Sequence, residues 1–219
     1  MSNMQISADS LRDLPVFPLA STVFFPGTVL PLHLVEPQHI EMIQDAMGSH
    51  QCVAVALKRQ RQGRAGQDIH RIACVGKIIH AEKSNENALD VLVEGIGRVK
   101  LVQKLPQQSS YLRFRAVLIP QPSPRMLAGA SSELAKLQSC VVELGHLYAR
   151  TDAQLMEVLR ASHDPLGMAD ILAATLVADP LQQQKILGAK DVKTRLRHLV
   201  DTLAEVLVQS PTIGNERLN

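Results

Sequence analysis

The chain has 219 residues, of which 46% are hydrophobic and 20% charged, and its formal net charge is +2. These values are ordinary for a soluble globular protein with one large domain or two small ones. The small net charge provides no strong attraction for phosphate backbones, and an aromatic content of only 3% weakens any proposal of base stacking.

The sequence predicts a cytoplasmic protein. No apolar stretch approaches the roughly 20 residues that span a bilayer. The N-terminus, MSNMQISADS, lacks the apolar core of a signal peptide. Three widely spaced cysteines, Cys52, Cys74 and Cys140, cannot all be paired, so we expect buried free thiols rather than a disulfide framework.

Residues 14–37 are an apolar run interrupted by prolines, and they contain three of the four phenylalanines. Proline lacks an amide donor and fixes φ, so the run predicts edge strands joined by tight turns rather than a helix. Pro26-Gly27 is a turn signal. The alternation of leucines over residues 30–34 predicts a strand with one buried face.

A short helix is predicted to begin at Pro37 and to end at Gly48. Its apolar face is formed by Ile40, Ile43 and Met47.

Several strands are predicted between residues 52 and 119, with a hairpin turn at residues 84–87. Gly95 and Gly97 indicate a bulge or sharp bend between two of them. The expected strands are 52–57, 71–83, 89–93, 98–105 and 111–119. Many short strands with one helix indicate a small, closed or nearly closed β-barrel.

The proline-rich segment 120–124 is predicted to be a stiff linker, and the rest of the chain is predicted to be helical. Helices are expected to start at Asp164, Asp179 and Asp191, and a longer one to cover residues 126–149. The expected organisation is therefore α+β, with a barrel domain over residues 1–121 and a helical bundle over residues 122–219.

Five segments of the sequence together resemble the N-terminal domain of Lon proteases. They are LPVFPL, FPG and LPLHLVEP within residues 14–37, VLVEGIGRV at 91–99, ADILAATL at 169–176, LQQQKIL at 181–187 and DVKTRL at 191–196. The resemblance implies a PUA-like β-barrel followed by a helical bundle. It also implies a domain that recognises polypeptide, such as misfolded client proteins or a protease-related partner, and performs no chemistry itself.

The motifs of the other Lon modules do not occur in the sequence. A phosphate-binding loop G-x-x-x-x-G-K-[ST] is absent, and so is the glycine-flanked serine context of the peptidase. The resemblance therefore predicts a freestanding, non-enzymatic relative without a cofactor. The histidines show no metal-ligand spacing, and the adjacent residues Ser162-His163-Asp164 cannot form a triad, which assembles through space.

Two surfaces are candidate binding sites. An exposed pair Phe24-Phe25, with Met42 and Met47 as an adaptable surround, could hold unfolded polypeptide. The alternative for these residues is that they close the barrel interior.

The basic loop 58–71 is the second candidate surface, and it predicts either a solvated loop or an anion-binding, RNA-binding module. Its candidate residues are Lys58, Arg59, Arg61 and Arg64.

Overall fold

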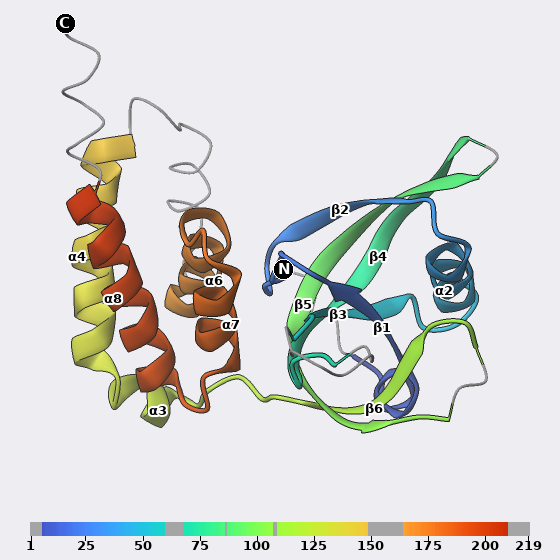
Figure 1. The fold of residues 1–219 in the computed structure, drawn as a ribbon. Coiled ribbons are helices and arrows are strands. Elements are labelled where there is room, and N and C mark those ends of the chain that lie inside the picture. Colours follow the sequence, from blue (N-terminus) through green and yellow to red (C-terminus); the bar gives the residue numbers. More distant parts are fainter. Residues whose placement is uncertain (1–5, 60–67, 86, 107–108, 149–163, 210–219) are drawn as a thin grey trace, which may run out of the picture. The chain divides into compact units, whose positions relative to one another are not determined.

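The structure is a computed structural model that describes residues 6–59, 68–85, 87–106, 109–148 and 164–209 (Figure 1). The chain divides into two compact units, Met1–Pro120 and Gln121–Asn219. Each unit is described by itself below.

The first unit contains two helices and six strands in its described part. In chain order they are α1 (Ala8–Arg12), β1 (Leu14–Leu19), β2 (Val29–Leu34), α2 (Pro37–Met47), β3 (Cys52–Leu57), β4 (Ile72–Asn85), β5 (Ala88–Lys104) and β6 (Leu112–Leu118). Helix α2 begins at Pro37 and is capped by Gly48, as predicted.

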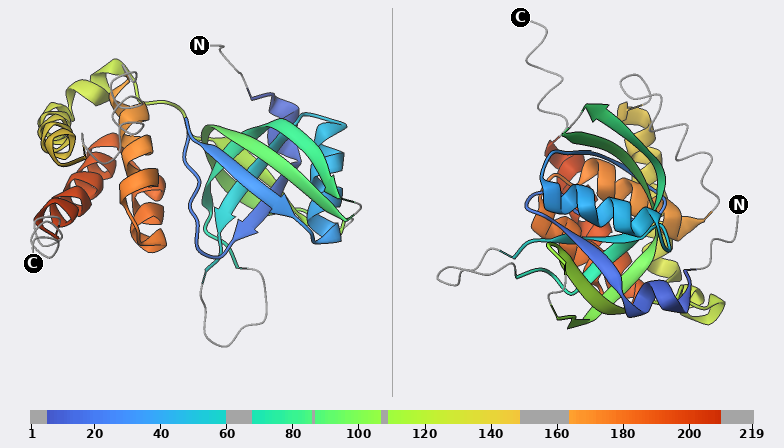
Figure 2. Two further views of the ribbon diagram at one scale, coloured as in Figure 1. Left: turned by 90° about the horizontal axis from the view of Figure 1, so that it is seen from above. Right: turned by 90° about the vertical axis from the view of Figure 1, so that its right-hand side faces the viewer.

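The six strands form one sheet in the order β2-β5-β4-β3-β1-β6, and β6 pairs with β5 as well as with β1. The long strand β5 makes this possible. Its first half pairs with β2, from Leu34↔Leu89 to Val29↔Glu94, and its second half pairs with β6. The sheet therefore curves back on itself, which Figure 2 shows from two further directions.

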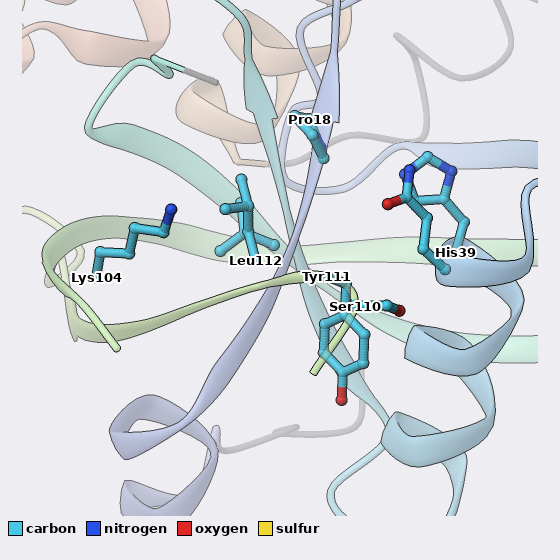
Figure 3. A pocket seen from close by; sticks show the side chains of 8 residues that line it. Pro18, His39, Lys104, Ser110, Tyr111 and Leu112 are labelled. Atoms are coloured by element: carbon cyan, nitrogen blue, oxygen red, sulfur yellow. The ribbon is translucent and has the colours of Figure 1, made fainter. Parts of the chain in front are cut away.

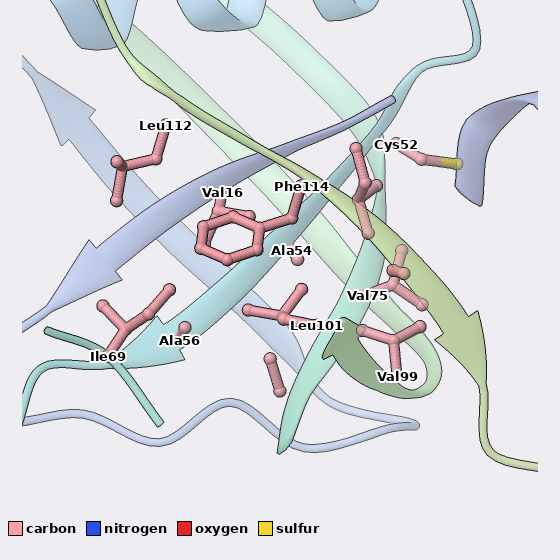
Figure 4. Close-up of a cluster of buried hydrophobic side chains, with 13 residues drawn as sticks. Val16, Cys52, Ala54, Ala56, Ile69, Val75, Val99, Leu101, Leu112 and Phe114 are labelled. Carbon is pink, nitrogen blue, oxygen red and sulfur yellow. The ribbon is translucent and has the colours of Figure 1, made fainter. Parts of the chain in front are cut away.

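The curved sheet buries apolar side chains on both of its faces. One cluster lies inside the curve and includes Val16, Ala54, Val75 and Phe114 (Figure 4). The other lies on the opposite face and includes residues of α2. Strand β3 contributes alternate residues to the two clusters, which explains its uninterrupted apolar sequence CVAVAL.

Glycines in β4 and β5 make room for the Phe24-Phe25 segment. A Cβ atom on Gly95 would lie 2.3 Å from the carbonyl oxygen of Phe25, and one on Gly76 would lie 2.8 Å from the Phe24 ring. The amide of Gly27, whose φ is 74°, donates to the carbonyl of Gly95 (2.8 Å). The predicted turn thus docks onto the predicted bulge, where the β4–β5 register shifts.

Strand β1 accommodates its prolines because it has a partner on only one side along much of its length. It pairs with β6 over residues 14–16 and with β3 over residues 16–19. The amide of Lys58 donates to the carbonyl of Leu19 (2.7 Å), so Leu19 faces β3. Backbone groups alternate along a strand, so Pro18 faces the other side, where pairing with β6 has ended.

Strand β2 is an edge strand, as the proline pattern predicted. The amide of Gly95 donates to the carbonyl of Thr28 (2.8 Å), which places Thr28 on the β5 side. By alternation Leu30 and Leu32 also turn their backbone groups toward β5, whereas Pro31 turns its backbone toward the open edge.

The second unit is helical in its described part, with α3 (Pro124–Ala128), α4 (Ser131–Tyr148), α6 (Pro165–Leu176), α7 (Pro180–Gly188) and α8 (Val192–Gln209). The prediction of a single helix over residues 126–149 is wrong. Helix α3 ends at its cap, Gly129, and a separate helix, α4, begins at Ser131. The predicted starts are confirmed: the Asp164 and Asp179 side chains accept hydrogen bonds from amides of the first turns of α6 and α7.

Polar contacts join the helices of this unit. Asp170 of α6 and Arg195 of α8 form an ion pair. The amide group of Gln183 in α7 donates to the carbonyl of Val177 (2.8 Å). Glu133 of α4 lies 3.6 Å from Arg197 of α8. None of the helices in the described part of the chain is long and apolar enough to cross a membrane.

Candidate functional site

The predicted aromatic surface is not formed. Phe24 and Phe25 are only 3% and 0% exposed, and Met42 is completely buried. The expectation of an exposed aromatic pair is therefore wrong, and the alternative, in which these rings fill the interior, describes the structure. The physical reason is the space left by Gly76 and Gly95, on strands far away in the sequence. Of the four predicted residues, Met47 is exposed.

The basic loop is described only at its two ends. Lys58 and Arg59 are exposed, whereas Arg61 and Arg64 lie outside the described residues. The Arg59 amide donates to the Asp68 carbonyl (2.8 Å), which closes the base of the loop. The guanidinium of Arg71 lies 5.2 Å from the centre of the Phe114 ring and so already has a partner.

An apolar row lies exposed on the outer face of β2, β5 and β4, a region that we call the outer-sheet patch. Its members are Val29, Pro31, Ile79 and Leu92. The register places Pro31 opposite Leu92 and Leu92 opposite His80, beside Ile79. The other face of these strands is buried, so polar residues are expected here. The sequence contains these apolar residues, but the pattern of alternation alone does not show that they lie together on the exposed face.

Charged side chains flank the outer-sheet patch. Asp90 lies 2.6 Å from His33 on the neighbouring strand, and hydrogen bonds from His33 and Ser84 hold the pKa of Asp90 below its ordinary value. His80 lies 3.4 Å from Glu82. An apolar centre with a polar rim is the composition of many protein-binding surfaces.

Hydrogen bonds connect α2 to the segment that leads into β6. The Ser110 hydroxyl donates to Glu41 (2.6 Å), and the Tyr111 hydroxyl donates to Asp45 (2.8 Å). Burial, followed by the hydrogen bond to Asp45, raises the pKa of Tyr111 to about 12. The Arg113 guanidinium binds both carboxylate oxygens of Asp13, which raises the pKa of Arg113.

Two cavities adjoin this connection and share Tyr111. The smaller, of about 260 Å³, is lined by Val16, Pro18, Gln38, His39, Lys104, Ser110, Tyr111 and Leu112 (Figure 3). The larger, of about 380 Å³, is lined by Asp13, Pro15, Glu41, Asp45, Ala46, Ser49, His50, Ser109, Tyr111 and Arg113. Lys104 provides the positive charge of the smaller cavity, whereas three carboxylates lie in the larger one.

The described residues contain no group of three or more histidine, cysteine or acidic side chains that could hold a metal ion. Burial raises the pKa of the Cys52 and Cys140 thiols, the opposite of what activates a cysteine nucleophile.

The fold and the sequence match known proteins over most of the chain. Residues 13–205 match the family model described as the ATP-dependent protease La (LON) substrate-binding domain. A solved structure of the N-terminal domain of Mycobacterium avium complex Lon protease superposes with a TM-score of 0.67 at 19% identity, covering 88% of this chain and 98% of that one. A Lon N-terminal domain protein from Xanthomonas campestris superposes with a TM-score of 0.57 at 17% identity, covering 86% and 97%.

Curated relatives are longer than this chain. A Lon protease of Anaeromyxobacter dehalogenans is 26% identical over 87% of this chain and 23% of its own length. A Lon protease 2 of Herpetosiphon aurantiacus is 32% identical over 92% of this chain and 25% of its own length. The chain thus spans about a quarter of the relatives that it matches. Since the family model covers residues 13–205, the chain belongs to the family of Lon substrate-binding domains.

Proposed function

We propose that this chain binds segments of unfolded polypeptide, without catalysing a reaction, through the outer-sheet patch. The observation that carries the proposal is an apolar row exposed where a half-solvated sheet normally presents polar side chains. Val29 and Ile79 are 52% and 48% exposed, so each has apolar surface left for a partner to cover. The family description, substrate binding, supports polypeptide as that partner.

The shape of the patch favours weak binding that tolerates many sequences. It is the face of a sheet rather than a deep pocket, so no side chain of the partner has to fit a fixed outline. Full burial of one aliphatic side chain contributes about 1.5–3 kcal/mol, from which the cost of ordering the bound segment must be subtracted. Client proteins that expose apolar segments suit such a surface, and binding them would give this chain a role in protein quality control.

The PUA-like barrel class is part of the same proposal and is supported by the pairing of β6 with both β1 and β5. The absence of phosphate-loop and peptidase motifs from the sequence supports a non-enzymatic role.

The test measures binding of a permanently unfolded protein, reduced and carboxymethylated α-lactalbumin, to the purified chain. The double variant Ile79→Ser with Leu92→Ser is expected to bind about tenfold more weakly, which corresponds to about 1.4 kcal/mol. The matched control is Val102→Ser with Val117→Ser, because these valines are exposed on strands β5 and β6 outside the patch. Equal affinities for the two double variants would refute the patch as the site.

RNA binding by the loop 58–71 is the competing function. A salt-dependent retention of RNA that disappears in Lys58→Gln with Arg59→Gln, together with no binding of the unfolded protein, would replace the polypeptide proposal.

A further inference from the structure

The smaller cavity lies where β1 lacks a strand partner. Pairing of β1 with β6 ends at Val16↔Leu112, whereas β1 continues to Leu19 along β3. Pro18 lines the cavity and turns its backbone carbonyl toward this open side, as the alternation from Leu19 requires. An extended chain that enters the cavity therefore meets a backbone acceptor.

The size and walls of the cavity suit the end of a polypeptide. Its volume of about 260 Å³ is below the roughly 300–1,000 Å³ of typical small-molecule sites, so it has room for one or two residues. Pro18, Tyr111 and Leu112 provide apolar wall surface around that space (Figure 3).

The charge of the cavity is positive. Among the described residues Lys104 has no ion-pair partner, and it is exposed at the cavity. Burial lowers the pKa of His39 below its ordinary value; the nearby Glu36 acts in the opposite direction, and the charge of Lys58 adds to the lowering. Glu36 contacts Gln38 (2.7 Å) and His39 (3.4 Å), but it is not among the residues that line the cavity.

We propose that this cavity binds the carboxyl terminus of an extended polypeptide whose last residue is apolar. The terminal carboxylate lies beside the Lys104 ammonium, the last side chain packs against Tyr111 and Leu112, and a backbone amide donates to the Pro18 carbonyl. This site is separate from the outer-sheet patch and does not depend on it.

The neighbouring cavity sets the direction of the bound chain. Asp13, Glu41 and Asp45 line it, and Arg113 is already paired with Asp13. A chain that placed its carboxylate there would be repelled by like charges, whereas a basic residue upstream of the terminus is attracted. The bound terminus therefore points toward Lys104 and away from the carboxylates of the larger cavity.

The experiment measures fluorescence anisotropy of a labelled hexapeptide ending in leucine, titrated with the full chain. Peptides with a free carboxylate, with an amidated end, and with an amidated end plus an internal aspartate are compared. The wild-type chain is expected to bind the free acid roughly three- to fivefold more tightly than the amide. Lys104→Gln removes this difference, Lys104→Arg keeps it, and Lys100→Gln, an exposed lysine on the same strand, keeps it too.

Equal binding of acid and amide by the wild-type chain would overturn the proposal, as would a difference that persists in Lys104→Gln. An internal-aspartate amide that binds as tightly as the free acid would also overturn it, since a side-chain carboxylate would then be the ligand. The Ile79→Ser, Leu92→Ser variant is expected to keep the preference for the free acid. Failure of the outer-sheet patch and failure of this site are thus distinguishable.

Discussion

Arg195 of α8 and Asp170 of α6 form an ion pair in which the two side chains are only 5% and 6% exposed. Both residues belong to the C-terminal segments that resemble Lon domains, DVKTRL and ADILAATL. The resemblance in this half of the chain thus includes a polar contact that fixes α6 against α8, in addition to apolar spacing.

Removal of one partner of this pair is expected to destabilise the helical unit strongly. Arg195→Met leaves the Asp170 carboxylate buried without its counter-charge, which costs about 3–5 kcal/mol. Asp170→Leu with Arg195→Met removes both charges, and we expect it to recover most of that loss. Urea unfolding followed by helical circular dichroism measures both variants. A double variant as unstable as Arg195→Met would show that packing, not charge, is what was lost.

Gly95→Ala is expected to disrupt the unit that contains the curved sheet, because the new methyl group would lie 2.3 Å from the Phe25 carbonyl oxygen. Such overpacking costs about 1–3 kcal/mol. Gly48→Ala is the control: its nearest neighbours are 3.6 Å away and its φ of −72° suits alanine, so stability is expected to rise by about 0.4–1 kcal/mol. Thermal unfolding measures the melting temperature of both variants. Equal melting temperatures would contradict the close contact at Gly95.

Tyr111 is expected to lose its proton at about pH 12 instead of the ordinary value of 10.0. The folded chain holds this proton more tightly than the unfolded chain. The resulting stabilisation is therefore complete below pH 10 and is lost as the pH rises toward 12. Tyrosinate absorbance in a Tyr148→Phe background measures the titration of Tyr111 alone.

Asp45→Asn provides the control for the tyrosine titration. It removes the carboxylate that the Tyr111 hydroxyl contacts, so the pKa of Tyr111 should fall. It should stay above 10.0, because burial is the larger cause of the shift. An unchanged titration in Asp45→Asn would mean that the hydrogen bond does not form.

Asp191 is expected to stabilise α8 through its cap. Its carboxylate accepts hydrogen bonds from the Thr194 amide (2.8 Å) and hydroxyl (2.9 Å), and the amide is the main cause of its lowered pKa. Asp191→Ala should cost about 1 kcal/mol at pH 7. Because the folded-state pKa is depressed, the cost should vanish as the pH falls below 3.8 and through the lowered value. Asp201→Ala, an exposed change on the same helix, should cost little at either pH.

Helices and strands could be predicted from the sequence where a short local pattern determines them. Proline after aspartate marked the starts of α6 and α7, and leucine alternation marked β2. The burial of Phe24 and Phe25 was not readable, because it depends on Gly76 and Gly95, which reach that segment only through the sheet register.

The candidate sites were hard to predict for the same reason. The outer-sheet patch exists because the strand register places Pro31 opposite Leu92 and Leu92 opposite His80, next to Ile79 at a register shift. The cavity beside Lys104 exists because β6 stops pairing with β1 before β1 ends. Both features depend on pairing between strands that are distant in the sequence, and the hydrophobic periodicity of one segment does not predict that pairing.

Pro31 on the edge strand β2 limits aggregation through that edge. Exposed strand borders recruit other strands and can start fibrils, because their unpaired donors and acceptors act as a template. A gap in the row of donors at Pro31 prevents a continuous ladder from growing outward. The outer-sheet patch can therefore stay exposed while the neighbouring edge of β2 resists pairing with strands of other molecules.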